Sequence, residues 1–299
     1  MAHAASVRWS RTYASGLDRP EGPAFLPTGE LLVVEMGRET RAVTIIDPAG
    51  GLRVLRRTGG FPQGICLDRD GAVWVAEAHE HAVLKLAPDG VELGRVETAD
   101  GLDLLWPNDL AVGKDGAVYV TDSGARYQEL LGPQGMREEY PKESLNGRVY
   151  RVDRETLTAS VLDAGLMFGN GIAVDDEGRV YANDTFSGLV YRYTPGAAGQ
   201  VTREEFARTK GDRAIAEPGG PDGMKFGADG RLYCAMFRQG HLAVVAPDGS
   251  VAERIPTRGP APTNIAFDLH GEPRAYVTDM ALGTVDVYIM PCGGAALYT

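Results

Sequence analysis

The stretch 108–121, NDLAVGKDGAVYVT, contains the pattern that decides the fold of this chain. It starts at a polar residue, continues with a short apolar run, reaches a glycine eight residues on and ends with a second apolar run. The chain contains six copies of this pattern, and a constant spacing predicts one structural unit used six times. The polar residues, which we call anchors, are Glu21, Gln63, Asn108, Asn170, Asp222 and Thr263. Their glycines are Gly29, Gly71, Gly116, Gly178, Gly230 and Gly271.

Each copy predicts a β-hairpin followed by two further strands. In the copy quoted above, 109–112 is the first strand, 114–116 the turn and 117–121 the return strand. An Asp-Gly turn supplies the positive φ that a tight hairpin requires, and the flanking runs are rich in β-branched and aromatic residues. A third apolar run follows each hairpin, and a more polar fourth run usually comes after it. Each unit therefore has four strands.

Six units of four antiparallel strands predict an all-β fold, a six-bladed β-propeller formed by residues 1–299 as a single domain. The glycines lie 42, 45, 62, 52 and 41 residues apart, so the longer intervals mark insertions. The last copy has only 28 residues after Gly271. We therefore expect 7–13, before the first anchor, to pair into the last blade and close the ring.

The propeller topology brings the anchors together at one mouth of the central channel, on the face that we call the top. Four of them carry oxygen atoms of the kind that a hard divalent cation prefers: Glu21, Asn108, Asn170 and Asp222. Two carboxylates and two amides would hold one divalent ion and leave positions for water or substrate. Calcium is the first choice, with Mn²⁺, Fe²⁺ or Zn²⁺ as alternatives, because oxygen ligands discriminate poorly among them. A water-filled polar mouth without an ion is the competing interpretation.

Composition narrows the range of partners. The chain has 30 Lys and Arg against 41 Asp and Glu, a net charge of -11, which disfavours nucleic acid and anionic membranes as partners. No apolar stretch approaches the ~20 residues of a membrane span, and the first 19 residues lack the apolar core of a signal peptide. Three cysteines are too few for a disulfide framework. These features predict a cytoplasmic protein and leave its oligomeric state open.

Two long insertions are expected on the top face. Residues 124–146 follow the second strand of the third copy and are predicted to form a lid over the channel mouth. Residues 209–220 join the fourth and fifth copies on the same face. Acids at the ends of the second strands are expected to hydrogen-bond between blades: Glu35, Glu77, Asp122 and Asp184.

Four motifs around the anchors resemble the SMP-30/gluconolactonase/LRE-like family. They are PEGP (20–23), PNDL (107–110), GNGIA (169–173) and GGPDG (219–223), and the ending 283–298 is also similar. The motifs occur in the family's order and span almost the whole chain. The resemblance implies a six-bladed propeller with a divalent ion in its channel, commonly a lactone hydrolase. It also implies Glu21, Asn170 and Asp222 as metal ligands, and Asn108 as a ligand of the metal or the substrate.

One position departs from the family's sugar-lactone pattern. Such members often have an arginine two residues before the Asn of the Asn-Asp pair, where this chain has Trp106. An indole offers an apolar face and one hydrogen-bond donor instead of a guanidinium. With Phe168 and Phe186 on the predicted rim, Trp106 favours a substrate less polar than an aldonolactone. We expect these three aromatic residues and Asn108 to contact the substrate.

The predicted function is a metal-dependent lactonase, a carboxylic ester hydrolase acting on a small-molecule lactone or ester. The ion would polarise the carbonyl, and Asp222 would accept the proton of the attacking water through a metal-bound water. Direct attack by Asp222 is an alternative, and Asn108 would orient the carbonyl. The rival hypotheses are a non-catalytic propeller that binds a ligand or protein, and another enzyme on this scaffold. The latter would be a phosphotriesterase-like hydrolase or a strictosidine-synthase-like condensing enzyme.

Overall fold

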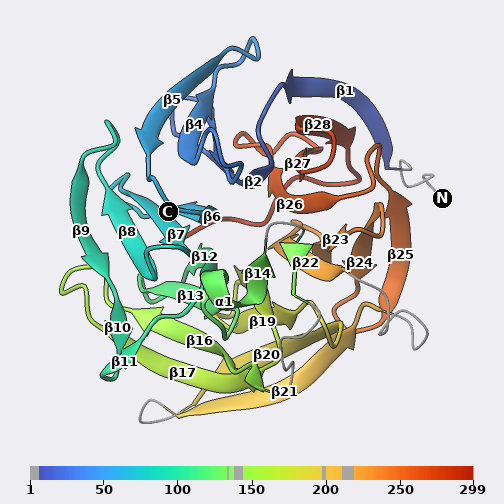
Figure 1. Ribbon diagram of the computed structural model, residues 1–299. Helices are drawn as coiled ribbons and strands as arrows, with labels where there is room; N and C mark the ends of the chain where they lie inside the picture. The colour runs from blue at the N-terminus through green and yellow to red at the C-terminus, as the bar shows by residue number, and fades with distance from the viewer. Residues whose placement is uncertain (1–6, 133–134, 138–143, 197–199, 211–218, 299) are drawn as a thin grey trace.

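The computed structural model describes residues 7–132, 135–137, 144–196, 200–210 and 219–298. In this part of the chain, six four-stranded antiparallel sheets surround a central channel as the blades of a propeller (Figure 1). The predicted fold is therefore confirmed.

The strands of each blade run from the channel outward in chain order. Blade 1 comprises β2 (Pro20–Phe25), β3 (Leu31–Glu35), β4 (Ala42–Ile46) and β5 (Leu52–Arg57). Blade 2 comprises β6 (Pro62–Leu67), β7 (Val73–Glu77), β8 (Ala82–Leu86) and β9 (Glu92–Val96). Blade 3 comprises β12 (Pro107–Val112), β13 (Val118–Asp122), β16 (Gly147–Val152) and β17 (Ala159–Leu166). Blade 4 comprises β18 (Gly169–Val174), β19 (Val180–Asp184), β20 (Leu189–Pro195) and β21 (Val201–Arg208). Blade 5 comprises β22 (Gly220–Phe226), β23 (Leu232–Phe237), β24 (His241–Val245) and β25 (Val251–Pro256).

Blade 6 closes the ring with strands from both ends of the chain. It comprises β26 (Pro262–Phe267), β27 (Arg274–Asp279), β28 (Thr284–Ile289) and β1 (Arg8–Ser15). The strand β1 pairs antiparallel with β28, and Arg8 lies opposite Ile289 (Figure 1). This pairing confirms the closure expected from the short last repeat. It joins the first and last parts of the chain, so the ring has no open seam.

Apolar side chains fill the layers between neighbouring blades. Between blades 1 and 2, for example, Val34 and Ile45 pack with Ile65 and Leu84. Equivalent clusters lie between every other neighbouring pair in the described chain, including blades 6 and 1. The middle strands are buried on both faces because each sheet is covered by two neighbours, which explains their runs of β-branched residues. This packing fixes the inner strands that carry the anchors.

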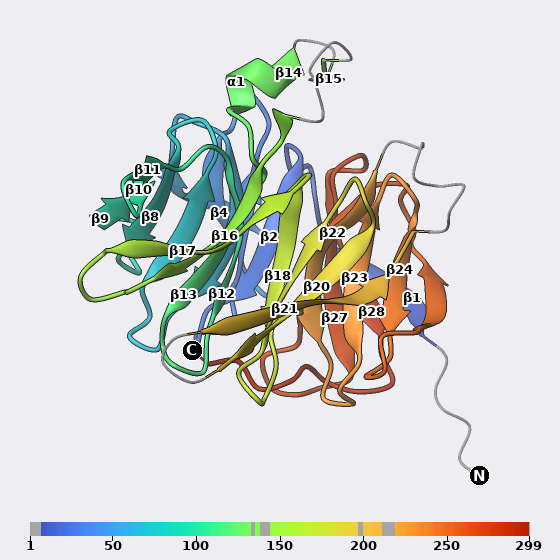
Figure 2. The same cartoon turned by 90° about the horizontal axis from the view of Figure 1, so that it is seen from below.

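Short elements extend the blades on the top face. The helix α1 (Tyr127–Leu130) and the pair β14 (Leu131–Gly132) and β15 (Gly135–Met136) project above the ring from blade 3 (Figure 2). They belong to the predicted lid, of which residues 133–134 and 138–143 lie outside the described chain. A second small pair, β10 (Thr98–Ala99) and β11 (Leu102–Asp103), precedes blade 3. The lid therefore stands on the face where the anchors lie, as the sequence predicts.

The C-terminal segment lies across the opposite, bottom mouth of the channel. The backbone N–H of Ala295 donates to Phe226 O, and the Tyr298 hydroxyl donates to Asp175 O at 2.7 Å. A cavity of about 560 Å³ lies above this segment. It is lined mostly by apolar residues, and its charged lining residues include Arg69 and Lys225. None of the helices in the described ranges is long and apolar enough to cross a membrane.

Candidate metal and catalytic centre

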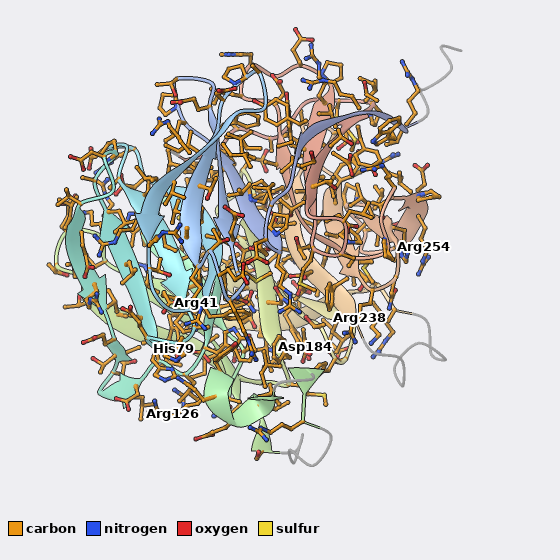
Figure 3. All side chains as sticks on the ribbon, turned by 45° about the horizontal axis from the view of Figure 1, so that its top comes forward. Arg41, His79, Arg126, Asp184, Arg238 and Arg254 are labelled. Carbon is orange, nitrogen blue, oxygen red and sulfur yellow. The ribbon has the colours of Figure 1, made fainter. Side chains whose placement is uncertain are left out.

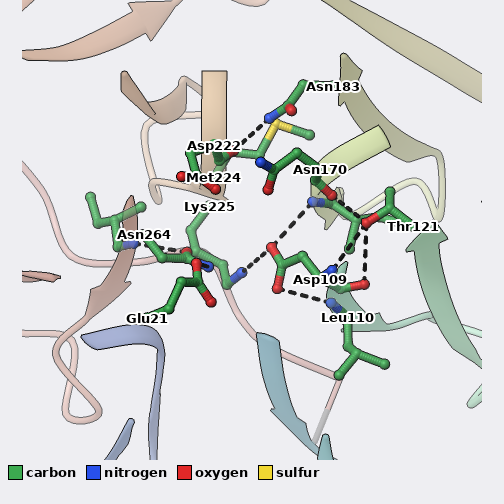
Figure 4. A network of polar contacts seen from close by, with 12 residues as sticks. Glu21, Asp109, Leu110, Thr121, Asn170, Asn183, Asp222, Met224, Lys225 and Asn264 are labelled. Carbon is green, nitrogen blue, oxygen red and sulfur yellow. Dashed lines mark hydrogen bonds and ion pairs between the residues drawn. The ribbon is translucent and has the colours of Figure 1, made fainter. Parts of the chain in front are cut away.

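The six anchors occupy the same structural position, near the start of each inner strand. A shift of register interrupts the pairing of the inner two strands beside every anchor, for example between Glu21 and Ala24 and between Pro221 and Met224. A β-bulge re-aims the side chains beside it. Figure 4 shows the result for Glu21, Asn170 and Asp222, which come from three blades and face one central space.

The four predicted metal-binding anchors are all buried at this mouth. Glu21 and Asn108 are each 5% exposed, Asn170 is 7% exposed and Asp222 is 8% exposed. Asn170 lies close enough to Asp222 to lower the pKa of that carboxyl, and the charge of Asp222 raises the pKa of Glu21. Asn108 lies at the equivalent position in blade 3, next to blade 4. The structure thus gathers residues that are up to 201 positions apart in the sequence, from Glu21 to Asp222.

Two hydroxyl groups fix which way the asparagine amides point. Ser123 Oγ donates to Gly169 O at 2.9 Å and accepts a hydrogen bond from Asn108 Nδ2 at 3.0 Å. Thr185 Oγ1 donates to Pro221 O at 2.8 Å and accepts from Asn170 Nδ2 at 3.1 Å. A hydroxyl has one proton to donate, so it must act as an acceptor toward the amide. The NH₂ group of each amide therefore faces the hydroxyl, and the amide oxygen faces away from it.

Two buried oxygen atoms of the anchors have no hydrogen-bond partner in the described chain. They are Glu21 Oε2 and Asn170 Oδ1. The other carboxylate oxygen of Glu21 accepts from Asn264 Nδ2 at 2.8 Å. An unsatisfied buried polar atom costs about 1–3 kcal/mol, and more when it is charged. A cation among these oxygens would remove that cost, so the side chains present fit a bound metal ion.

The charges around the mouth also favour a cation. Burial, together with the nearby carboxylates of Asp109 and Asp222, raises the pKa of Glu21 well above its ordinary value. Burial and Asp109 raise the pKa of Asp222 in the same direction. Lys225 Nζ lies 3.9 Å from Asp109 Oδ2, so one ammonium faces three buried carboxylates. A divalent ion would supply the positive charge that these groups lack.

The ligand set depends on amide oxygens. Among the described residues, no group of three or more His, Cys, Asp or Glu side chains is arranged to hold a metal ion. The four anchors supply only two carboxylates, and the remaining oxygens belong to Asn108 and Asn170. Carboxylate and amide oxygens together suit calcium better than they suit a thiophilic metal.

The remaining two anchors have other partners. Gln63 donates to Met36 Sδ at 3.0 Å and accepts from Trp106 Nε1 at 3.4 Å. Thr263 Oγ1 donates to Pro20 O at 3.0 Å, which links blade 6 to blade 1. These two side chains tie neighbouring elements together at the mouth.

Three charged or polar residues of this centre, Asp109, Lys225 and Asn264, were not predicted from the sequence, although each stands out when the six copies of the repeat are compared. Three residues after the anchor, the other five copies have Ala or Cys and the fifth copy has Lys225. One residue after the anchor, four copies have glycine, whereas the third and sixth have Asp109 and Asn264. A Cβ at Gly64 would collide with Asp109, and one at Gly223 would collide with Asn264. The glycines therefore leave the space that these two side chains occupy.

The orienting hydroxyls have a signal of the same kind. Ser123 and Thr185 each follow their asparagine anchor by 15 residues, and Thr278 follows Thr263 by 15. The Glu, Gln and Asp anchors have Met, Ala and Phe at this distance. Comparing the copies column by column would have indicated which anchors are amides held by a hydroxyl.

The three aromatic residues predicted to contact substrate meet in one cluster on the top face. Trp106 is only 4% exposed, and its ring makes edge contacts with Phe168 at 5.4 Å between centroids. Phe168 is buried, whereas Phe186 is partly exposed and lies 5.0 Å from Phe168. We call this group the rim cluster; it consists of Phe61, Ala78, Trp106, Ala125, Tyr127, Leu130, Leu131, Leu145, Phe168 and Phe186.

The described part of the lid packs on the rim cluster. The ring of Tyr127 lies 5.4 Å from that of Trp106, and Leu130 and Leu145 are buried in the same cluster. The indole of Trp106 therefore supports the lid, and little of the indole surface remains exposed. The other predicted top-face segment, 209–220, is described only at its ends, because 211–218 lie outside the described residues.

The acids that end the second strands hold the rim through its backbone. Asp122 accepts hydrogen bonds from the backbone N–H groups of Leu105 and Trp106, at 2.7 and 3.0 Å. Asp184 likewise accepts from Phe168 and Phe186, at 3.3 and 3.0 Å. These bonds join the two loops flanking the inner hairpin of one blade. The expectation that these acids hydrogen-bond between blades is wrong, since Ser123 and Thr185 make those links instead.

Comparison with known proteins identifies the family. A family model described as SMP-30/Gluconolactonase/LRE-like region matches residues 97–281, more than half of the chain. A gluconolactonase of Zymomonas mobilis is 26% identical over 257 residues, 79% of this chain and 69% of the relative. A pentonolactonase of Haloferax volcanii is 25% identical over 265 residues, 86% of this chain and 80% of the relative.

A solved gluconolactonase structure from Xanthomonas campestris superposes with a TM-score of 0.76 and is 25% identical. The superposition covers 94% of this chain and 89% of the other. Three of the four anchors, Asn108, Asn170 and Asp222, lie inside the matched family region, and the structure adds Glu21 beside them. The chain belongs to the SMP-30/gluconolactonase/LRE-like family.

Proposed function

We propose that this protein is a divalent-metal-dependent hydrolase that opens lactones or related esters. The observation that carries the proposal is the pair of unpartnered buried oxygens, Glu21 Oε2 and Asn170 Oδ1, beside Asp222. A scaffold that only binds proteins has no need for this arrangement, which costs stability unless a cation is bound. Lactonases among the relatives, acting on gluconolactone and pentonolactone by name, support the reaction class.

The residues that would hold the ion are Glu21, Asn108, Asn170 and Asp222. Calcium is our first choice, because all four supply oxygen atoms. When bound, the ion would polarise the lactone carbonyl and stabilise the negative charge that develops on its oxygen. The hydroxyls of Ser123 and Thr185 keep the amide oxygens turned toward the ion's position.

Asp222 is our candidate for the general base. Its carboxylate would accept a proton from a water molecule while the water oxygen bonds to the carbonyl carbon. The ring C–O bond then breaks, the proton passes to the departing ring oxygen, and the product is a hydroxy acid. Asn108 uses one N–H on Ser123, so its second N–H remains to orient the carbonyl of the substrate.

The rim cluster would contribute to substrate binding mainly through Phe186. Phe186 is partly exposed, whereas Trp106 and Phe168 are buried behind it and support it. We propose that an apolar part of the substrate reaches the cluster at this side chain, with Trp106 and Phe168 packed beneath it. The preference for a substrate less polar than an aldonolactone is part of this proposal, as is a cytoplasmic location.

The decisive experiment is a lactone screen on the metal-stripped protein. Sugar, aliphatic and aromatic lactones are tested by pH-stat after adding Ca²⁺, Mn²⁺, Fe²⁺ or Zn²⁺ in turn. We expect at least one ion to restore turnover and Asp222→Asn to lower kcat by about 100-fold or more. Asp248→Asn, the same change in an exposed turn on the bottom face, is the matched control. Turnover that is absent with every ion, or unchanged in Asp222→Asn, would contradict the proposal.

A further inference from the structure

A hollow of about 550 Å³ opens on the top face beside the centre, on the side away from the rim cluster. Its lining includes Arg19, Phe237, Arg238, Pro260 and Met280. These residues come from the top loops of blades 1, 5 and 6. The hollow is thus built on the half of the mouth that the lid does not cover.

The lining residues lie close to the metal-binding anchors along the chain and across the sheet. Arg19 precedes Glu21 by two residues. Phe237 pairs with Gly220, which precedes Asp222 by two residues. A molecule with its reacting carbonyl at Glu21 and Asp222 would therefore extend naturally into the hollow.

The two arginines of the hollow have no carboxylate partner in the described part of the chain. Both are exposed, and no hydrogen bond or ion pair of either side chain is found among the described residues. Two other arginines of the upper loops are engaged: Arg41 donates to Gly59 O and Arg258 pairs with Asp286. Figure 3 shows Arg238 on the same face as Arg126 at the base of the lid. In a chain of net charge -11, two unpaired arginines in one hollow form an anion-binding arrangement.

The rest of the lining is apolar. The guanidinium of Arg238 lies 5.5 Å from the centre of the Phe237 ring, a cation–π distance. Pro260 and Met280 complete the wall with hydrocarbon and thioether groups. The hollow therefore combines positive charge with a surface suited to a short carbon chain.

We propose that this hollow binds an acidic arm of the substrate, so that the protein prefers lactones bearing a carboxylate, sulfonate or phosphate on a short hydrocarbon chain. The inference rests on the proposed function and names its substrate class. Arg19 and Arg238 bind the anion, since a planar guanidinium matches the oxygen atoms of these groups in pairs. Phe237, Pro260 and Met280 contact the chain that connects the anion to the lactone ring.

The test compares two lactones that differ only in charge. γ-Butyrolactones with an alkyl arm of one to four carbons are prepared with a terminal carboxylate or the matching carboxamide. At low ionic strength, we expect kcat/KM to be about tenfold higher for the best carboxylate than for its amide. The preference should fall to near unity in the double variant Arg19→Gln/Arg238→Gln, and it should shrink as salt is added to the wild type.

Arg69→Gln is the matched control. Arg69 is also exposed and forms no ion pair with the described residues, but it lies at the bottom mouth of the channel. The substitution Arg69→Gln also removes one positive charge from the protein. Because this charge lies far from the hollow, its loss should leave the carboxylate preference intact. A preference of equal size in the double variant, or no preference in the wild type, would overturn the proposal.

A binding measurement separates this inference from the proposed function. If the wild type opens no lactone at all, the proposed function fails, and the hollow is then tested by calorimetric titration with glutarate and glutaramide in calcium buffer. Binding of glutarate about tenfold tighter than glutaramide, lost in the double variant and kept in Arg69→Gln, would support the anion site. Equal binding of the two probes, or a difference that the double variant retains, would reject it.

Discussion

The two halves of the top face differ in how their side chains are used. Over blades 2, 3 and 4, the covered half, aromatic rings are stacked beneath a lid, and Trp106 is almost fully buried. Over blades 5, 6 and 1, the open half, a hollow contains two arginines that have no ion pair with the residues the structure describes. The four anchors proposed to bind the metal lie between the halves.

The difference shows that an apolar residue near a site does not by itself indicate an apolar substrate. Trp106 occupies the position for which the family resemblance led us to expect an arginine, but its ring packs against Tyr127 and Phe168. In the open half, Arg19 and Arg238 are exposed and make no hydrogen bond or ion pair with the described residues. We therefore expect the covered half to contribute mainly to stability, with Phe186 as its contact to the substrate, and the open half to determine the preference for a charged arm.

The largest expected effect is on stability in the covered half. Trp106→Ala removes a buried indole from the rim cluster and should lower the free energy of unfolding by about 3–5 kcal/mol. Met280→Ala, in the partly exposed wall of the open half, should cost clearly less. Urea unfolding of the two variants measures the difference, and equal losses would remove the distinction between the halves.

The variant Trp106→Arg tests whether position 106 is covered by the lid or open to the substrate. Without the burial of Trp106, this exchange would be expected to restore the sugar-lactonase pattern and its activity on aldonolactones. Because the site lies beneath the lid, it instead places a guanidinium in an apolar cluster, which is costly. We expect destabilisation in the same urea experiment and no gain of aldonolactone turnover by pH-stat. A stable variant with such a gain would show that the lid leaves this position open.

The second effect concerns pH and a carboxyl group at the edge of the covered half. Glu77 is buried, accepts hydrogen bonds from Phe61 and Glu80, and burial raises its pKa to about 7. Its unfolded value is near 4.5, so the folded state binds the proton more tightly. Its contribution to stability is complete below pH 4.5 and is lost as the pH rises through 7. Because one pKa unit corresponds to about 1.4 kcal/mol, the full change is about 3–4 kcal/mol.

Glu77→Gln should remove this part of the pH dependence, because glutamine does not titrate. Unfolding free energies of both proteins, measured from pH 4.5 to 8, give the contribution by difference. Parallel curves for the wild type and the variant would mean that Glu77 titrates normally in the folded protein.

A smaller effect is expected at the boundary between the halves, where a hydroxyl orients a metal-binding amide. Thr185→Val removes the acceptor of Asn170 Nδ2 and the donor to Pro221 O. The amide is then free to turn, and metal affinity should fall about 10- to 100-fold. Thr185→Ser keeps the hydroxyl and should restore most of the affinity in a calorimetric titration. Equal affinities of the Val and Ser variants would show that the hydroxyl does not orient the amide.

The repeat made the fold predictable, whereas parts of the centre depend on contacts that the repeat does not encode directly. Constant spacing from anchor to glycine predicted the blades, the closure by the first strand and the position of Glu21, Asn170 and Asp222. Position within a copy also places Lys225 at the channel, but its distance to Asp109 depends on the packing of two separate blades. The burial of Trp106 depends on how the lid folds, and no periodicity describes that segment.

Our proposal requires that four of the anchors, Glu21, Asn108, Asn170 and Asp222, bind one divalent ion. Its most direct test is a calcium titration by calorimetry of the metal-stripped wild type, with Glu21→Gln and Asp222→Asn as variants and Asp248→Asn as the control. We predict one ion bound per chain in the wild type and the control. The calcium affinity of Glu21→Gln should be at least about tenfold weaker than that of the wild type, and Asp222→Asn should bind calcium more weakly still. No bound ion in the wild type, or equal affinity in all four proteins, would contradict the account.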